Sequence, residues 1–511
     1  MMQRTQLQLK RQRGQGILGL SRHLLLKAFF GGNAILAIVV LLLITFFLFR
    51  EGLSFFPQYR EDLESYSKSG MEYVSLIKEE QGRFKELTNS LVAIQSARIE
   101  QLQAEGLSQT EIRSKTAPMQ EYLYDFMDLA IPLRNYQVQV QAIAAATYMD
   151  SQAAQTQAEN AFDEGQFTET VALLRDSVPD FLNTQRELAQ GIRKRMAEVP
   201  YADDPALRDQ VAKFKQSADT FLDNIPRAEA QIKAWEPSAK VSFFDAIKAF
   251  VLGRDWVINN DGHSLYGLLP LFTGSLLVTG IAIVIALPFG VGAAIYTNQM
   301  ATRRESSMIK PFIEFITAIP SVVIGFFGIA VLGTTLRWLS QLPLLSWWPG
   351  FPIVERLNAF TAGCLLALMA IPTIFTLSED ALNRVPRIYK ESSFALGATR
   401  FQTTMRIIVP SAVSGIISAV LLGIGRVIGE TMVVVLCAGN RIRIPDFSQG
   451  MGVPFEPVHT MTGIIAQEMG EVAQGGVHYR ALFCVGIVLF LLTLVINMVA
   501  QKIFRHTRVG E

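Results

Sequence analysis

Six long apolar runs constrain this chain more than any other feature. A helix needs about 20 apolar residues to cross the roughly 30 Å of hydrocarbon in a bilayer. A composition of 50% hydrophobic and 18% charged residues is also typical of a membrane protein. We therefore predict an all-α membrane protein with six transmembrane helices, at about Ala28–Phe49, Leu268–Tyr296, Phe312–Leu336, Ala359–Leu377, Ser411–Ala438 and Ala481–Ala500.

The first run could be mistaken for a signal peptide. Its apolar core is too long for one, and no small-residue cleavage site follows it. We expect it to remain as a membrane anchor.

Lysine and arginine residues predict the orientation, because they concentrate in short cytoplasmic loops. Six of them lie between Arg4 and Lys27, before the first span. Others follow the second span, the fourth span and the sixth span. Threading six spans puts these segments on one side, so we expect a multi-pass protein of the cytoplasmic (inner) membrane with both termini in the cytoplasm.

A hydrophilic insertion (57–240) separates the first span (1–56) from the other five (241–511). Between Glu51 and Arg254 there are 22 Lys and Arg against 31 Asp and Glu, a net charge of −9. Apolar residues recur at helical spacing, with breaks near 106–108, 160–165 and 200–205, which predicts about four long helices in an antiparallel bundle. Leu53-Ser-Phe-Phe56 before the bundle is echoed by Val241-Ser-Phe-Phe244 after it, as expected of an inserted domain. The orientation places it in the periplasm or outside the cell, but nothing in its sequence indicates what it recognises.

We expect no metal site, cofactor or nucleic-acid surface. The three cysteines lie in apolar runs and are interpreted as buried small hydrophobic residues. None of the five histidines has metal-ligand spacing, and no dense basic run with interleaved aromatic residues occurs.

The loop between the fourth and fifth spans (379–410) carries the most specific motif. Glu391-Ser-Ser-Phe-Ala-Leu-Gly397 is followed, nine residues later, by Ile407-Ile-Val-Pro410. This resembles the loop of permeases of binding-protein-dependent ABC importers, which reads Glu-Ala-Ala, three residues, Gly, nine residues, Ile-x-Leu-Pro. The resemblance implies that a separate ATPase docks on Glu391, Ala395, Gly397, Ile407 and Pro410.

Local chemistry agrees with a docking loop. Pro386 can begin a short helix, and Gly397 permits a sharp turn into the next one, so the loop predicts a rigid knob of two short helices. The sequence has no Gly-x-x-x-x-Gly-Lys-Ser/Thr loop. We therefore expect partner subunits to hydrolyse ATP and this chain not to be an enzyme.

Two ionisable residues stand in the fifth span. Arg426 and Glu430 are four residues apart, which on a continuous helix would place them on one face. A charge at the bilayer centre costs about 2.5–3.5 kcal/mol on insertion scales, so such residues usually face an interior or a wet path. Arginine suits a tetrahedral oxyanion, because it offers a planar fork of donors and a permanent charge. The alternative is a structural salt bridge without cargo contact.

Gly425-Arg-Val-Ile-Gly-Glu-Thr-Met432 resembles the Gly/Ser-Arg-Ala-Ile-Gly-Glu-Thr-Met signature of phosphate-specific ABC permeases of the PstC type. The segments 377–382, 395–399 and 319–321 are similar to that family as well. Val427 in place of alanine is the one departure in the charged motif, and the insertion lies outside the resemblance. The resemblance implies a phosphate path along Arg426, Glu430 and Thr431.

The same resemblance implies the partners. They are a second homologous permease forming a heterodimer, two ATPase subunits, a soluble phosphate-binding protein and membrane lipid. One rival function is an importer permease for sulfate, molybdate or tungstate. Another is a membrane receptor with a helical sensor domain, and a third is a channel or carrier independent of ATP, which would leave the loop 391–410 without a role.

Overall fold

The computed structural model describes residues 18–156, 163–237, 241–257, 264–342, 348, 350–353 and 355–506. Most of the basic N-terminal segment, the end of the basic tail and much of the break predicted at 160–165 lie outside these ranges. Within the described part, the six predicted membrane helices are confirmed. They fall in Leu26–Lys68, Leu269–Met300, Ser321–Ser340, Ala359–Asn383, Arg400–Ile428 and Val477–Ile503.

The chain divides into two compact units. The first comprises Met1–Phe56, Lys248–Trp256 and Leu265–Glu511, and the second comprises Pro57–Ile247 and Val257–Ser264. Three elements span this division: α3 (Phe55–Lys68), α10 (Phe243–Leu252) and β1 (Trp256–Val257), which pairs with β2 (Leu265–Tyr266).

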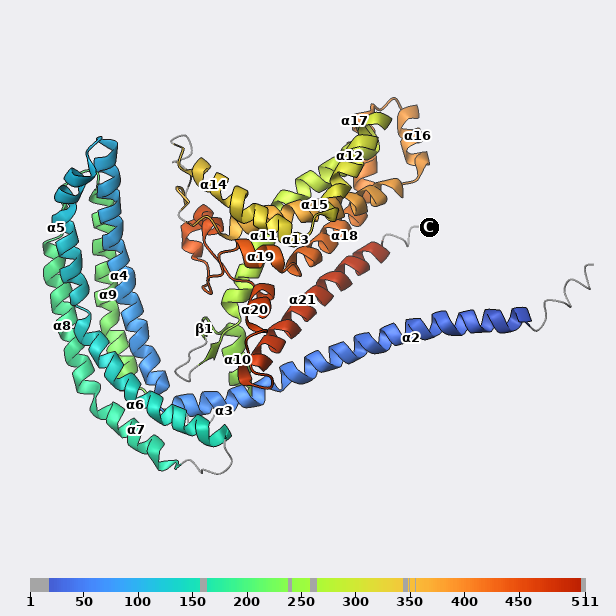
Figure 1. The fold of residues 1–511 in the computed structure, drawn as a ribbon. Helices are drawn as coiled ribbons and strands as arrows, with labels where there is room; N and C mark the ends of the chain where they lie inside the picture. The colour runs from blue at the N-terminus through green and yellow to red at the C-terminus, as the bar shows by residue number, and fades with distance from the viewer. Residues whose placement is uncertain are drawn as a thin grey trace, which may run out of the picture. The chain divides into compact units, whose positions relative to one another are not determined.

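The first unit is a layer of neighbouring helices. Helix α15 (Ala359–Asn383) packs between α11 (Leu269–Ile295) and α18 (Val409–Ile428), and α21 (Val477–His506) packs between α18 and α2 (Leu18–Leu53) (Figure 1). Small residues allow these helices to approach closely: a Cβ at Gly363 of α15 would lie 2.5 Å from the Ile281 side chain of α11, and one at Gly423 of α18 would lie 2.8 Å from the Ile374 side chain of α15. The remaining elements of this unit are η1 (Tyr296–Met300), α12 (Arg303–Phe315), η2 (Ile316–Ala318), α13 (Ser321–Phe327), η3 (Gly328–Leu332), α14 (Gly333–Ser340), α16 (Arg387–Ala395), α17 (Arg400–Thr403), η5 (Thr404–Ile408), α19 (Met432–Cys437), η6 (Phe447–Phe455) and α20 (Met461–Glu468).

The third span is shorter than predicted. The run at 312–336 was expected to form one helix, but α12 ends at Phe315 and α13 begins only at Ser321. Pro320 causes this break, because a proline disfavours helical backbone in the residue before it. Ile319 accordingly has the extended values φ −78° and ψ 122°.

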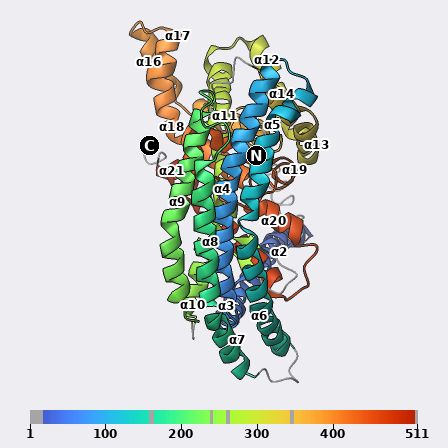
Figure 2. The ribbon, with the colours of Figure 1, turned by 90° about the vertical axis from the view of Figure 1, so that its left-hand side faces the viewer.

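The second unit is a helical bundle, as predicted, but α4 to α9 are six helices where about four were expected. Helices α4, α5, α8 and α9 run side by side, with α6 and α7 toward one end (Figure 2). Its core contains large aromatic side chains, among them Phe84, Phe126 and Phe214. The bounds are α4 (Met71–Ala104), α5 (Gln109–Asp128), α6 (Ile131–Thr156), α7 (Gly165–Asp176), α8 (Val178–Ala197) and α9 (Arg208–Lys233).

Candidate functional site

Arg426 lies in the last turn of α18 and is exposed in this chain. Its Nη1 donates a hydrogen bond of 2.7 Å to the hydroxyl of Thr373 on α15. Thr373 is a neutral acceptor, so the contact orients the guanidinium and leaves its positive charge uncompensated by that partner. Arg426 was predicted from the sequence but Thr373 was not, because a hydroxyl within an apolar span is not distinctive in a single sequence.

The assumption that Arg426 and Glu430 share a helical face is wrong. Helix α18 ends at Ile428, Gly429 caps it, and α19 begins at Met432. Glu430 and Thr431 therefore lie in a break between two helices, and both are half-buried. Within the described ranges, no ion pair includes Arg426 or Glu430. The structure thus gives no support to a salt bridge between them.

A segment around residues 456–464 supports the break. The Thr462 hydroxyl donates to the backbone carbonyl of Glu430 at 3.0 Å, which satisfies an acceptor that the interrupted helix leaves unpaired. The segment itself is held on α11, where the Ser275 hydroxyl accepts from the Met461 N–H at 2.9 Å. Gly274, one residue earlier, allows the close approach, since a Cβ there would lie 2.1 Å from the carbonyl oxygen of His459.

The predicted docking loop forms two short helices. Pro386 caps the start of α16, and Gly397, with φ +82°, turns the chain toward α17. The Thr399 side chain and Gln402 form a capping box at the start of α17. The hydroxyls of Ser393 and Thr403 are 2.9 Å apart and join the two helices. The knob lies where α15 ends and α18 begins (Figure 1).

The surface of this knob is more apolar than the motif indicated. Glu391, Ala395, Gly397 and Pro410 are exposed, and Ile407 is half-buried. Large apolar side chains at positions that the motif leaves open are exposed beside them, among them Ile388 (64%), Leu396 (89%) and Phe401 (62%). Isolated exposed apolar residues are common, but a group of them on one projecting element is typical of a protein interface.

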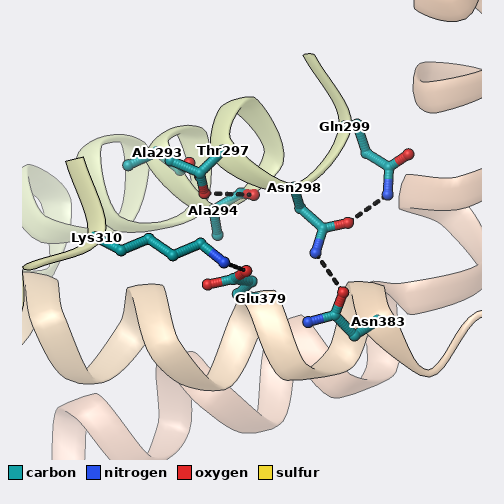
Figure 3. A network of polar contacts seen from close by, with 8 residues as sticks. All are labelled: Ala293, Ala294, Thr297, Asn298, Gln299, Lys310, Glu379 and Asn383. Carbon is teal, nitrogen blue, oxygen red and sulfur yellow. Dashed lines mark hydrogen bonds and ion pairs between the residues drawn. The ribbon is translucent and has the colours of Figure 1, made fainter. Parts of the chain in front are cut away.

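A polar network links the knob to the membrane helices. Lys390 on α16 donates to Gln299 at 3.1 Å, and Gln299 in turn donates to Asn298. Figure 3 shows how Asn298 reaches Asn383 at the end of α15, over 2.6 Å. In the same view Lys310 of α12 points to Glu379 of α15, with which it forms an ion pair. Because Glu379 is nearly buried, this pair fastens α12 to α15.

Comparison with known proteins identifies the family. The sequence profile of the family described as "Binding-protein-dependent transport system inner membrane component" matches residues 286–509. The "Probable ABC transporter permease protein YqgH" of Bacillus subtilis is 34% identical over 246 residues, which are 47% of this chain and 74% of that protein. The "Phosphate transport system permease protein PstC" of Pasteurella multocida is 30% identical over 271 residues, 52% of this chain and 81% of that protein. The protein of the same name from Mesorhizobium japonicum is 31% identical over 261 residues, which are 50% of this chain and 77% of that protein.

The chain belongs to this family. The resemblance inferred from the motifs is therefore confirmed. The permease is a subunit of a binding-protein-dependent ABC importer and a multi-pass protein of the inner membrane. No group of three or more potential metal ligands occurs in the part of the chain that the structure describes.

Proposed function

We propose that the permease imports inorganic phosphate across the cytoplasmic membrane. It would pair with a second homologous permease, two ATPase subunits and a soluble phosphate-binding protein. Two curated relatives at 30% and 31% identity are named as phosphate transport permeases, whereas the name of the YqgH relative gives no cargo. The names of these relatives support phosphate as the cargo, and so does the chemistry of the candidate site.

The single observation that carries the proposal is the setting of Arg426. Its guanidinium is exposed and hydrogen-bonded to one neutral hydroxyl, and it lies beside a break in a membrane helix. An arginine in this setting can bind a tetrahedral oxyanion through two parallel donors. Glu430 and Thr431, in the break, would line the same path. The negative charge of Glu430 would weaken anion binding, so that phosphate passes without being trapped.

We further propose that the knob formed by α16 and α17 receives an ATPase subunit. Its exposed apolar residues would fill a groove on the ATPase, and the network from Lys390 to Asn383 would pass the movement to the membrane helices. In this arrangement both termini are cytoplasmic. The insertion (57–240) is then an extracytoplasmic domain.

Uptake of radiolabelled phosphate tests the proposal in cells that lack the chromosomal copy and express a variant. Arg426→Gln should lower uptake by about 10- to 100-fold, because charged hydrogen bonds contribute about 1.5–3 kcal/mol. Its level in the membrane should be unchanged, since the side chain makes one hydrogen bond to a neutral partner. Arg426→Lys keeps the charge but lacks the planar fork, so its phosphate uptake should lie between that of the wild type and that of Arg426→Gln. Thr373→Val should lower phosphate uptake less than Arg426→Gln does, because it removes only the bond that orients the guanidinium.

The controls separate the rival functions. Excess sulfate, molybdate or tungstate should not compete with phosphate in the wild type, and equal competition would assign the permease to another oxyanion. Unchanged phosphate uptake by Arg426→Gln, at a normal membrane level, would refute the role of Arg426.

A further inference from the structure

A cavity lies where α15, α18 and α21 meet, at the end of α15 that leads to the docking knob. Its volume is about 380 Å³, within the range of small-molecule sites. Leu377, Ala381, Ala419 and Leu422 supply apolar walls. The polar side chains at the cavity are Asp380 and Arg384 of α15, Ser418 of α18 and Gln501 of α21.

The cavity lies on the same helix faces as the contact between Arg426 and Thr373. On α15, Thr373, Leu377, Asp380 and Arg384 follow one another at spacings of four, three and four residues. These spacings keep all four on one face of the helix. On α18, Ser418, Leu422 and Arg426 are spaced four apart and likewise share a face.

Arg384 is therefore about 16 Å from Thr373 along the helix, at 1.5 Å per residue. An anion that moves from Arg426 along these helix faces toward the knob would reach the cavity next.

We propose that this cavity is a second binding station for phosphate, with Arg384 as its cation and Asp380 as the residue that selects phosphate. The inference rests on the proposed phosphate path through Arg426. The Gln501 amide can donate to a phosphate oxygen, and the guanidinium can bind two more. At neutral pH, phosphate still carries at least one proton, which the Asp380 carboxylate can accept in a hydrogen bond. Sulfate has no such proton, so the same carboxylate repels it.

The position of Arg384 also connects the station to the ATPase. Arg384 caps the end of α15, and Pro386 caps the start of α16, so only Val385 separates the station from the docking knob. A displacement of α16 that shifts the end of α15 would move the guanidinium relative to Gln501 on α21. Affinity for phosphate at this station would change as the knob moves, which would help to release cargo on the side of the knob.

The test measures binding of inorganic phosphate to the purified full chain in lipid nanodiscs, with sulfate as the competitor. Arg426→Gln serves as the background, so that the remaining binding reports the cavity. In that background, Arg384→Gln should weaken phosphate binding by about 10- to 100-fold. Asp380→Asn should lower the preference for phosphate over sulfate by about tenfold or more, because an amide donates to sulfate as readily as to phosphate. Arg304→Gln, which removes an exposed arginine of α12, is the matched control and should change neither value.

The outcomes distinguish this inference from the proposed function. Phosphate uptake that depends on Arg426, with binding in the Arg426→Gln background unaffected by Arg384→Gln, would overturn the second station alone. An unchanged preference for phosphate in Asp380→Asn would overturn the selective role of the carboxylate. If the wild type neither imports nor binds phosphate, the proposed function fails and the station fails with it.

Discussion

The contact between Gly274 and the segment around His459 can be tested with one methyl group. Gly274 lies on α11, and a Cβ at this position would lie 2.1 Å from the carbonyl oxygen of His459. A backbone oxygen cannot move aside by changing rotamer, so Gly274→Ala must push the whole segment away. Gly280, on the same helix, has no atom within 4 Å of its ideal Cβ. Gly280→Ala is therefore a matched control.

The comparison isolates the cost of the clash. Replacing glycine by alanine inside a helix favours the helix by about 0.8–1.0 kcal/mol, and this contribution is similar in the two variants. The difference between them is then the cost of overpacking, about 1–3 kcal/mol. The segment also holds the carbonyl of Glu430 through Thr462, so displacement at Gly274 should disturb the candidate site as well.

The measurement is the apparent melting temperature of the purified permease in mild detergent, followed by phosphate uptake in cells. We expect Gly274→Ala to melt earlier than Gly280→Ala and to transport less. Equal melting temperatures for the two variants would show that α11 and the segment do not pack as described.

Three other perturbations probe separate parts of the chain. Gly397→Ala should strain the turn by about 1–2 kcal/mol, because Gly397 has a φ of +82°. A Cβ there would meet open space, so this backbone strain is the whole effect. A pull-down should show weaker ATPase binding at an unchanged membrane level, and undiminished binding would contradict the docking role. A chain that joins Phe56 to Phe244 should still insert, since Phe55 and Phe56 pack on Phe250 within the first unit; loss from the membrane fraction would show that the bundle is needed for folding. Burial lowers the pKa of His459. Below about pH 6.5 the unfolded chain therefore binds more protons than the folded one, and the stability of the folded chain falls. The melting temperature of the wild type should exceed that of His459→Asn by less at pH 5.5 than at pH 7.5, and a constant difference would refute a neutral, buried imidazole.

Much of the bundle could be predicted because its breaks have local chemical causes. Ser108 and Glu111 form a capping box at the start of α5, and Gly106, with φ +78°, precedes it. The breaks before α6 and α8 were not predicted. Pro132 and Pro179 lie in the first turn of these helices, where proline is tolerated because the N–H groups there have no partner within the helix. Pro118 and Pro226 lie inside unbroken helices, however, so proline alone does not determine where a helix ends.

The candidate site was only partly predictable. The motifs identified Arg426 through the chemistry of its side chain, and they identified the turn at Gly397 through the backbone angle that glycine permits. The neighbours of Arg426 depend instead on tertiary packing. Thr373 lies 53 residues before Arg426, and Thr462 lies 32 residues beyond Glu430. Neither threonine stands out in a single sequence.

The broken fifth span, which the periodicity argument missed, strengthens the case for a cargo path. The apolar run at 411–438 has 28 residues, about 42 Å as one helix, although about 20 suffice to cross the hydrocarbon. Irregular backbone at membrane depth is tolerated only where protein covers it or where it lines a wet cavity. The break at 429–431 meets the first condition through the bond from Thr462 to Glu430. Arg426 beside it carries a charge, and charged side chains at membrane depth usually face a bundle interior or a water-filled cavity. Helix interruption and intramembrane charge thus lie next to each other at residues 426–431, where we propose the phosphate path.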